Sequence, residues 1–402
     1  MMTGKNDAAS GEEPVGDVSL AELFFTFLKI GSTAFGGFMA LISVVQNYVV
    51  ERRKLLRAED MLDGVSLATI LPGPVAVNVV AYAGYRVRGA RGALVSAAGV
   101  ILPSFLLITG LSVAYVRFGR MPAAGKIFQG FIPAVAAVIL VAAWNMGAKA
   151  IKGVPEALLA FAAAVLLLGV GGFFVTLAIV AGSGLAGILL FPAAAEQAPK
   201  TDSGRDVPKV PGTLHGAAAP LAAAPVAGLL AAPLIKLFLT FGVLSLLLFG
   251  GGYVFIPLIQ HVVVDAYGWV NRQEFIDAIA LGQVTPGPIL ISAAFIGYKV
   301  AGFAGAAAAT VAIFSPPAFV MVLCARSLDR IKRSARIKAA LRGIRPAIIG
   351  LIVAAGLAVG RTAPLNGASL FIFGAALIAL YRFKVETVWI IPLAGAAGLL
   401  LY

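Results

Sequence analysis

Two Pro-Gly-Pro tripeptides, at residues 72–74 and 286–288, are the sequence features best suited to form a binding site. Each lies in an apolar stretch, where two prolines cannot continue a regular helix because proline lacks an N–H donor and clashes with the preceding turn. Broken backbone at membrane depth is tolerated where it is buried in protein or lines a wet cavity. Half-helices starting at Pro74 and Pro288 would present free N–H groups that attract an anion. The alternative is a tight re-entrant turn without a ligand.

A Phe-Gly-Gly sequence precedes each tripeptide, at residues 35–37 and 249–251. Interrupted helices at corresponding positions of two halves mark the substrate site of many transporters. The alternative is close helix packing through small residues. The backbone part of the predicted substrate site therefore consists of Gly36, Gly37, Pro72, Gly73, Pro74, Gly250, Gly251, Pro286, Gly287 and Pro288.

Polar side chains near these breaks suit an oxyanion better than a metal cation, because they are hydroxyls and amides: Thr69, Asn78, Gln283 and Thr285. Lys29 lies before the first Gly-Gly pair, within an apolar segment. An ionisable group in such a segment is costly and is a functional candidate by default. The alternative is that its amine extends to the membrane surface. Its counterpart in the second half is Val243, so a charged site would be asymmetric.

Four carboxylates begin the segments that carry the tripeptides: Asp60, Asp63, Glu274 and Asp277. They are either helix-start residues favoured by the helix dipole or proton-coupling groups. A metal site is not expected, because the chain has one cysteine, Cys324, and two histidines far apart, His215 and His261. No cofactor is expected either.

The composition indicates a membrane protein. Of 402 residues, 60% are hydrophobic and 12% charged, and the mean hydropathy is +0.97, whereas soluble domains are about 45–50% apolar and about 25% charged. Apolar stretches repeatedly exceed the roughly 20 residues needed to cross a bilayer. The net charge of +13 reflects the lysines and arginines of cytoplasmic loops rather than nucleic-acid binding.

The chain contains an internal repeat. Each Phe-Gly-Gly and Pro-Gly-Pro of the first half recurs 214 residues later, and after a slip of one residue Gly84-Tyr85 recurs as Gly297-Tyr298. We expect a disordered tail at 1–19, a first transmembrane repeat at 20–191, a flexible cytoplasmic linker at 192–233 and a second repeat at 234–402.

Each half contains about six apolar segments, the first of them near 20–49 and 235–264. If every segment spans, there are about twelve spans and the halves are parallel; if the Pro-Gly-Pro segments re-enter, about ten span and the halves are inverted. The positive-inside rule favours inversion, because the cation-rich loops at 51–59, 86–91 and 326–345 then share the cytoplasmic face. The predicted fold is thus an all-α polytopic membrane protein with an inverted repeat and two re-entrant hairpins.

The paired Phe-Gly-Gly and Pro-Gly-Pro motifs resemble those of the chromate ion transporter family in its long-chain, two-repeat form. The resemblance covers about 20–190 and 235–400 and includes the Lys29 that precedes the first Phe-Gly-Gly. It implies export of chromate from the bacterial cytoplasm, chromate resistance, and sulfate as a structural mimic. The sequence departs from the family pattern at Phe38, Thr69 and Val243.

We therefore expect a secondary active transporter of the bacterial inner membrane rather than an enzyme. No Walker-type phosphate loop is present, and the spans contain almost no candidate catalytic residues. The alternatives are transport of sulfate or another oxyanion, and a passive anion channel. The expected partners are chromate or a sulfate-like oxyanion, the lipid bilayer, a coupling ion such as the proton, and a second copy in a homodimer.

Overall fold

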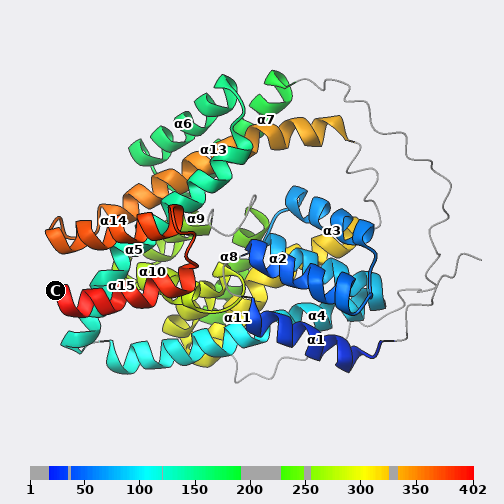
Figure 1. Cartoon of the computed structure of the whole chain (residues 1–402), viewed down its shortest axis with the longest axis horizontal. Coiled ribbons are helices and arrows are strands. Elements are labelled where there is room, and N and C mark those ends of the chain that lie inside the picture. The colour runs from blue at the N-terminus through cyan, green and yellow to red at the C-terminus, as the bar shows by residue number, and fades with distance from the viewer. Residues whose placement is uncertain (1–17, 35–37, 120, 192–227, 249–254, 326–333) are drawn as a thin grey trace, which may run out of the picture.

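A computed structural model describes residues 18–34, 38–119, 121–191, 228–248, 255–325 and 334–402 (Figure 1). Every regular element within these ranges is helical, as predicted. Most of the predicted tail and linker lies outside the described residues, so their boundaries stay predictions.

The two halves repeat the same order of elements. The first repeat consists of α1 (Leu20–Thr33), α2 (Phe38–Gln46), the π-helix η1 (Asn47–Arg52), α3 (Ala58–Ile70), α4 (Val75–Phe118), α5 (Pro122–Ala150), α6 (Val154–Gly169) and α7 (Phe173–Leu190). The second consists of α8 (Gly228–Leu246), α9 (Phe255–Gln260), the π-helix η4 (His261–Ala266), α10 (Arg272–Val284), η5 (Ile289–Ile291), α11 (Ser292–Ala325), α13 (Ala335–Gly360), α14 (Gly367–Tyr381) and α15 (Thr387–Leu401).

The predicted re-entrant hairpins are present. Helix α3 leads into the first Pro-Gly-Pro and α4 leads out of it, and Asp60 at the start of α3 forms an ion pair of 2.6 Å with Arg86 of α4. The equivalent residues of the second repeat, Glu274 and Lys299, form the same ion pair at 2.9 Å. Because each ion pair joins the start and the end of a hairpin, both ends lie on one face of the protein. The carboxylates at the two helix starts and the cations at the two hairpin ends therefore have a structural role.

The first segment of each repeat differs from the expected single span, because it also folds back. Arg53 after η1 forms an ion pair with Glu22 at the start of α1, and the Lys29 amine lies 5.6 Å from the centre of the Tyr48 ring. In the second repeat the Lys236 amine lies 3.8 Å from the centre of the Tyr267 ring. These contacts place η1 beside α1 in the first repeat and η4 beside α8 in the second, so the described parts of each first segment lie side by side. The sequence analysis counted each first segment as one span, because a Gly-Gly pair in an apolar run fits a continuous helix as well as a reversal.

A sharp turn links each Pro-Gly-Pro hairpin to a long helix. At this turn Gly89 has φ +63° and its counterpart Gly302 has φ +58°, a region that L-residues rarely occupy. The chain reverses, so that Gly84 lies against the backbone of Gly92. The rest of α4 and of α11 is long and apolar enough to cross a bilayer, as are α5 and α13.

The two repeats are inverted with respect to each other. The spanning part of α4 begins near Arg91, on the face that holds the ends of the first-repeat hairpins, and its last turns bring Tyr115 to Asp277. Asp277 lies in the second turn of α10, close to the ends of the second-repeat hairpins. The hairpins of the two repeats therefore enter from opposite faces. In Figure 1 α1, α2 and α3 lie to the right, and α14 and α15 to the left.

Helices α5 and α13 each pack against the last two helices of the other repeat. Helices α6 and α7 pack on α13, whereas α14 and α15 pack on α5 (Figure 1). Glu156 of α6, which is 2% exposed, is bound by the guanidinium of Arg342 of α13 at 3.1 Å. The two repeats are thus interleaved and form one structural unit.

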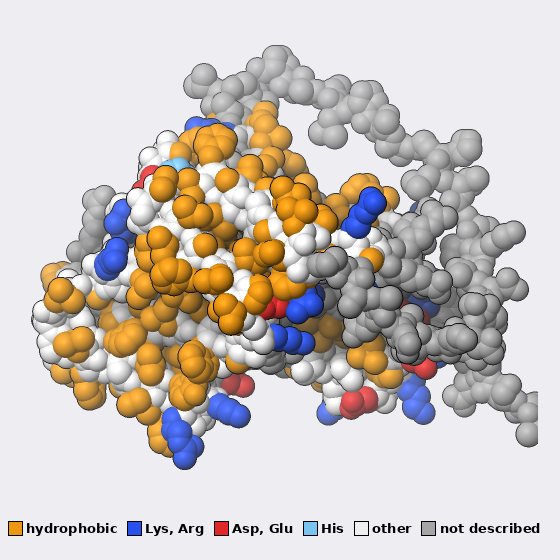
Figure 2. Space-filling view, turned by 90° about the horizontal axis from the view of Figure 1, so that it is seen from above, with side chains coloured by type: hydrophobic (Ala, Val, Ile, Leu, Met, Phe, Trp, Pro, Cys, Tyr) orange, Lys and Arg blue, Asp and Glu red, His pale blue; other side chains and the backbone are white. Residues whose placement is uncertain are grey.

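Large apolar side chains cover much of the outer surface, as Figure 2 shows for one face. They include Phe161, Phe174, Leu365 and Leu400, each at least 70% exposed. Such a surface is stable only against lipid. The chain is a multi-pass membrane protein.

Inversion predicts the labelling of two equivalent exposed positions, Arg91 and Ala304. Single cysteines at these positions, in a Cys324→Ser background, should react with a membrane-impermeant maleimide from opposite sides of the membrane. Right-side-out and everted vesicles give the two measurements. Labelling of both cysteines from the same side would contradict the inverted arrangement.

Candidate substrate-binding site

Two reciprocal backbone hydrogen bonds join the hairpin tips of the two repeats. The N–H of Gly73 donates to the carbonyl of Leu248 at 2.5 Å, and the N–H of Gly287 donates to the carbonyl of Ala34 at 2.8 Å. Ala34 and Leu248 are equivalent residues that directly precede the two Phe-Gly-Gly sequences. Each Pro-Gly-Pro turn of one repeat therefore meets the first hairpin of the other repeat.

Each Pro-Gly-Pro turn requires its glycine for two reasons. Gly73 and Gly287 have φ values of +101° and +99°, and a Cβ at either residue would collide with the spanning helix of the other repeat. Gly73 lies against Pro317 of α11, whereas Gly287 lies against Ser104 of α4, whose hydroxyl donates to the carbonyl of Pro286. Ser104 and Pro317 occupy equivalent positions. The sequence analysis did not select these two residues. The signal that could have found them is the pair of matched prolines directly before them, Pro103 and Pro316.

Several predicted polar residues lie at these tips. Asn78 is fully buried; its amide nitrogen donates to the carbonyl of Pro72 at 3.0 Å, and its Oδ1 has no hydrogen-bond partner. Thr285 is buried and donates to the carbonyl of Gly282. The amide nitrogen of Gln283 is buried without an acceptor. A buried donor without an acceptor is costly, and an anion would supply the acceptor.

Two other predicted residues are exposed. The Thr69 hydroxyl donates to the carbonyl of Ser66, and its side chain is exposed on α3. The Lys29 side chain is exposed on α1 and shares the ring of Tyr48 with Arg52. Lys29 precedes Ala34 by five residues, about 7 Å along the helix axis. Gly36, Gly37, Gly250 and Gly251 lie outside the described residues, between elements whose ends meet at the tips.

The helices that leave the turns have the polarity predicted for anion binding. Helix α4 begins at Val75, directly after Pro74, and η5 begins at Ile289, directly after Pro288. The first backbone N–H groups of a helix lack partners within the helix and carry partial positive charge. Across the described ranges no cluster of His, Cys, Asp and Glu residues could hold a metal ion. The chemistry of the tips is that of backbone and amide donors.

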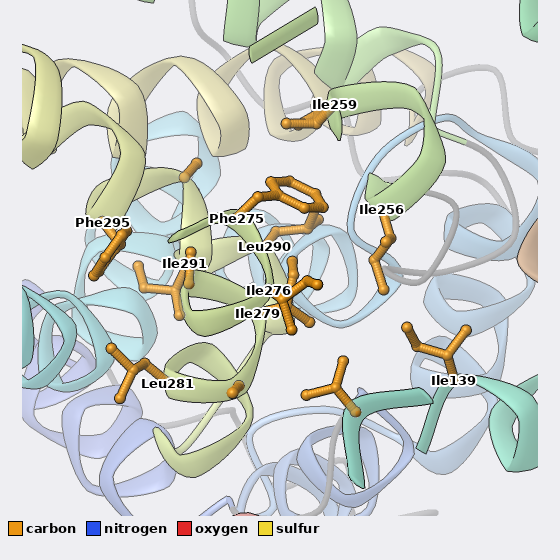
Figure 3. Close-up of a cluster of buried hydrophobic side chains, with 14 of the residues drawn as sticks. Ile139, Ile256, Ile259, Phe275, Ile276, Ile279, Leu281, Leu290, Ile291 and Phe295 are labelled. Carbon is orange, nitrogen blue, oxygen red and sulfur yellow. The ribbon is translucent and has the colours of Figure 1, made fainter. Parts of the chain in front are cut away.

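The surroundings of the two Pro-Gly-Pro hairpins are unequal. Helix α10 packs against α5 and α15, and all residues from 275 to 282 are buried. Figure 3 shows Phe275, Ile276 and Ile279 pointing into this apolar cluster. Helix α3 contacts α4 and α11 and, among the described elements, has no comparable packing on α13 or α7. Leu62 is consequently 61% exposed, whereas its counterpart Ile276 is 1% exposed.

Known proteins resemble the chain over nearly its whole length. A family model described as chromate transporter matches residues 21–188 and again 235–399. A chromate transport protein of Cupriavidus metallidurans is 30% identical over 393 residues, 96% of this chain and 94% of that protein. One from Pseudomonas aeruginosa is 30% identical over 399 residues, 96% of this chain and 93% of that protein.

A half-length relative supports the duplication. An uncharacterized transporter of Bacillus subtilis is 31% identical over 168 residues, which cover 41% of this chain and 94% of that protein. A single repeat therefore corresponds to nearly all of that protein. No solved structure matches the chain.

The turn glycines permit a controlled test of the tip packing. Gly73→Ala should lower the thermal stability of the purified protein and abolish substrate binding, because a Cβ there meets Pro317. Gly89→Ala is the matched control: its φ is also positive, but nothing lies within 4 Å of the added Cβ. Both variants carry backbone strain of about 1–3 kcal/mol, and only Gly73→Ala adds an overpacking cost of about 1–3 kcal/mol. Equal melting temperatures for the two variants would contradict this account.

Proposed function

This chain belongs to the chromate transporter family, and from that premise we propose that it is a secondary active transporter exporting chromate across the bacterial inner membrane. Export of chromate would make the host resistant to it. The proposal includes coupling to protons as the source of energy. A homodimer stays a prediction.

The meeting of the four hairpin tips is the observation that carries the proposal. Hairpins of opposite orientation bring Gly73 and Gly287 to the same level of the protein through their bonds to Leu248 and Ala34. Broken backbone with helix starts at membrane depth is the arrangement that inverted-repeat transporters use to bind substrate between their halves. A tetrahedral dianion suits such a site, because backbone N–H groups and the Gln283 amide donate without imposing the coordination geometry of a metal.

The unequal packing of the hairpins supports alternating access over a permanent channel. The side of the site bounded by α10 is closed by α5 and α15, whereas the equivalent surface of α3 is exposed. In an inverted repeat, exchanging these two environments exposes the site to the opposite face. A channel open to both faces does not need one side closed by a buried apolar interface.

The distribution of cations indicates which face is cytoplasmic. The hairpin ends of the first repeat, the start of α13 and the end of α14 share one face, which carries Arg52, Arg53, Arg57, Arg86, Arg88, Arg91, Arg336, Lys338 and Arg382. The opposite face carries Arg117, Lys126, Lys236, Arg272, Lys299 and Arg361. By the positive-inside rule the first face is cytoplasmic. The exposed α3 surface is therefore on the cytoplasmic side, where an exporter loads its substrate.

Uptake of labelled chromate into everted membrane vesicles tests the proposal. An energised exporter accumulates chromate in such vesicles, and excess unlabelled chromate inside accelerates entry of label by counterflow. A passive channel gives neither accumulation nor counterflow. Competition with sulfate separates two cases. In a chromate transporter, unlabelled chromate inhibits uptake of the label at lower concentration than sulfate does, whereas in a general oxyanion carrier the two inhibit equally.

Gln283→Met should weaken transport, because it removes the buried amide donor at nearly constant volume. A hydrogen bond to a charged group contributes about 1.5–3 kcal/mol, so the apparent KM for chromate should rise roughly 10- to 100-fold. Gln46→Met is the control, because Gln46 is an exposed glutamine of α2. An unchanged KM for Gln283→Met in the everted vesicles would remove Gln283 from the site.

Lys29→Gln should raise the KM more than it lowers the maximal rate. The Lys29 side chain is exposed, five residues before Ala34, so its charge attracts the dianion without contacting it in the bound state. The effect should shrink as ionic strength rises. Arg52→Gln is the matched control, since Arg52 lies over the same Tyr48 ring but belongs to η1, further along the chain from Ala34. Equal effects of the two substitutions would assign Lys29 to the packing of Tyr48.

A further inference from the structure

A buried carboxyl group lies at the closed side of the protein, away from the hairpin tips. The Asp277 side chain is 0% exposed. Tyr115 of α4 donates its hydroxyl to Oδ2 at 2.7 Å, and Gln273 donates its amide nitrogen to Oδ1 at 2.8 Å. Both donors are neutral, and among the described residues no lysine or arginine forms an ion pair with Asp277.

Three other carboxylates, two at hairpin ends and one on α6, form ion pairs with cations. Asp60 has Arg86, Glu274 has Lys299, and Glu156 has Arg342. The counterpart of Asp277 in the first repeat, Asp63, is half-exposed on α3. Asp277 therefore differs from its repeat partner in burial and from its neighbours in having no cation.

The groups that the structure places against Asp277 carry no positive charge, and the cations of α4 and α5 at this end, Arg117 and Lys126, are exposed. Helix α4 contributes the Tyr115 phenol, and α5 contributes the carbonyl of Phe128, 3.5 Å from the Gln273 amide. Helix α11 contributes the ring of Phe295 against Tyr115, and its Lys299 is engaged by Glu274 on α10 itself. Helix α15, which also packs on α10, contains no charged residue. The nearest charge on α10 is the Glu274 carboxylate, which opposes a second negative charge.

An isolated charge in this position is costly. Two neutral hydrogen bonds stabilise a carboxylate in part, but transfer of an unpaired ion out of water costs several kcal/mol, and such a group takes up a proton instead. The interface of α10 with α4, α5 and α15 is therefore compatible with the neutral acid. Separation of α10 from α5 and α15 would bring water to the carboxyl and permit ionisation.

We propose that Asp277 is the proton-binding site of the transport cycle, occupied while α10 is packed on α5 and α15 and vacated when they separate. The proton moves between Oδ of Asp277 and water, so the step involves no redox partner. Closure of this side then requires a proton, which couples proton movement to the exchange of environments between α3 and α10. This inference rests on the proposed transport function.

Asp277→Asn tests the proposal, because the amide is an isostere of the neutral acid. In proteoliposomes, the wild type should show chromate counterflow whose rate changes with pH and net accumulation driven by a pH gradient. The variant should retain counterflow, lose the pH dependence that the wild type shows at alkaline pH, where chromate stays a dianion, and lose accumulation by at least tenfold. Asp265→Asn is the control, an exposed aspartate close to the same face, and it should behave as wild type.

Each outcome has a distinct meaning. Retained pH dependence and accumulation in Asp277→Asn would overturn the proton site while leaving chromate transport intact. Loss of counterflow together with a lower melting temperature in Asp277→Asn would show that Asp277 is structural. Tyr115→Phe keeps the carboxyl group and removes one of its donors, so a structural role predicts the same loss in that variant. Absence of chromate counterflow in the wild type would refute the proposed function itself.

Discussion

The two reciprocal hydrogen bonds between hairpin tips are the constraint on which the structure depends. A Pro-Gly-Pro turn exposes backbone N–H and C=O groups at a depth where lipid offers no partner, and each unsatisfied group costs several kcal/mol. Neither repeat satisfies these groups alone. The Gly73 N–H finds its acceptor at Leu248 and the Gly287 N–H at Ala34, so each repeat completes the broken backbone of the other. The glycines are required because both the positive φ and the close approach of Pro317 or Ser104 exclude a side chain.

Interleaving of the repeats follows from the same requirement. If the tips must meet, the hairpins must enter from opposite faces, and the spanning helices α4 and α11 must pass beside the tips of the other repeat. The last helices of each repeat then pack on α13 or α5 of the other. Because the backbone contacts at the centre are nearly symmetric, they do not favour one face. The difference between the two sides resides in side-chain packing, where Ile276 is buried and Leu62 is not.

Much of this architecture could be predicted from the sequence, because it depends on residue types with strong backbone effects. The repeat, the re-entrant Pro-Gly-Pro hairpins and the helical class all follow from Pro and Gly at matched positions in apolar stretches. The pairing of α1 with η1 could not be predicted in this way, because glycine permits a reversal of the chain without requiring one. The contact of Glu22 with Arg53 establishes this pairing. The bracing by Ser104 and Pro317 and the burial of Asp277 beneath Tyr115 depend on which helices become neighbours, and no local pattern encodes that.

Paired positions of the two repeats carry different side chains within one scaffold. Where the first repeat joins the ends of its first hairpin with the ion pair Glu22 to Arg53, the second uses Lys236 over Tyr267 at equivalent positions. Both contacts join the two arms of the hairpin. The cation follows the second arm in the first repeat (Arg53) and lies on the first arm in the second repeat (Lys236). Likewise Asp63 and Asp277 occupy one position in the fold and differ in environment, because α10 has the neighbours that α3 lacks. In the proposed transport cycle the two hairpins serve as equivalent gates, and among the described residues only the α10 side carries a fully buried carboxyl group, Asp277, through which a proton would control closure.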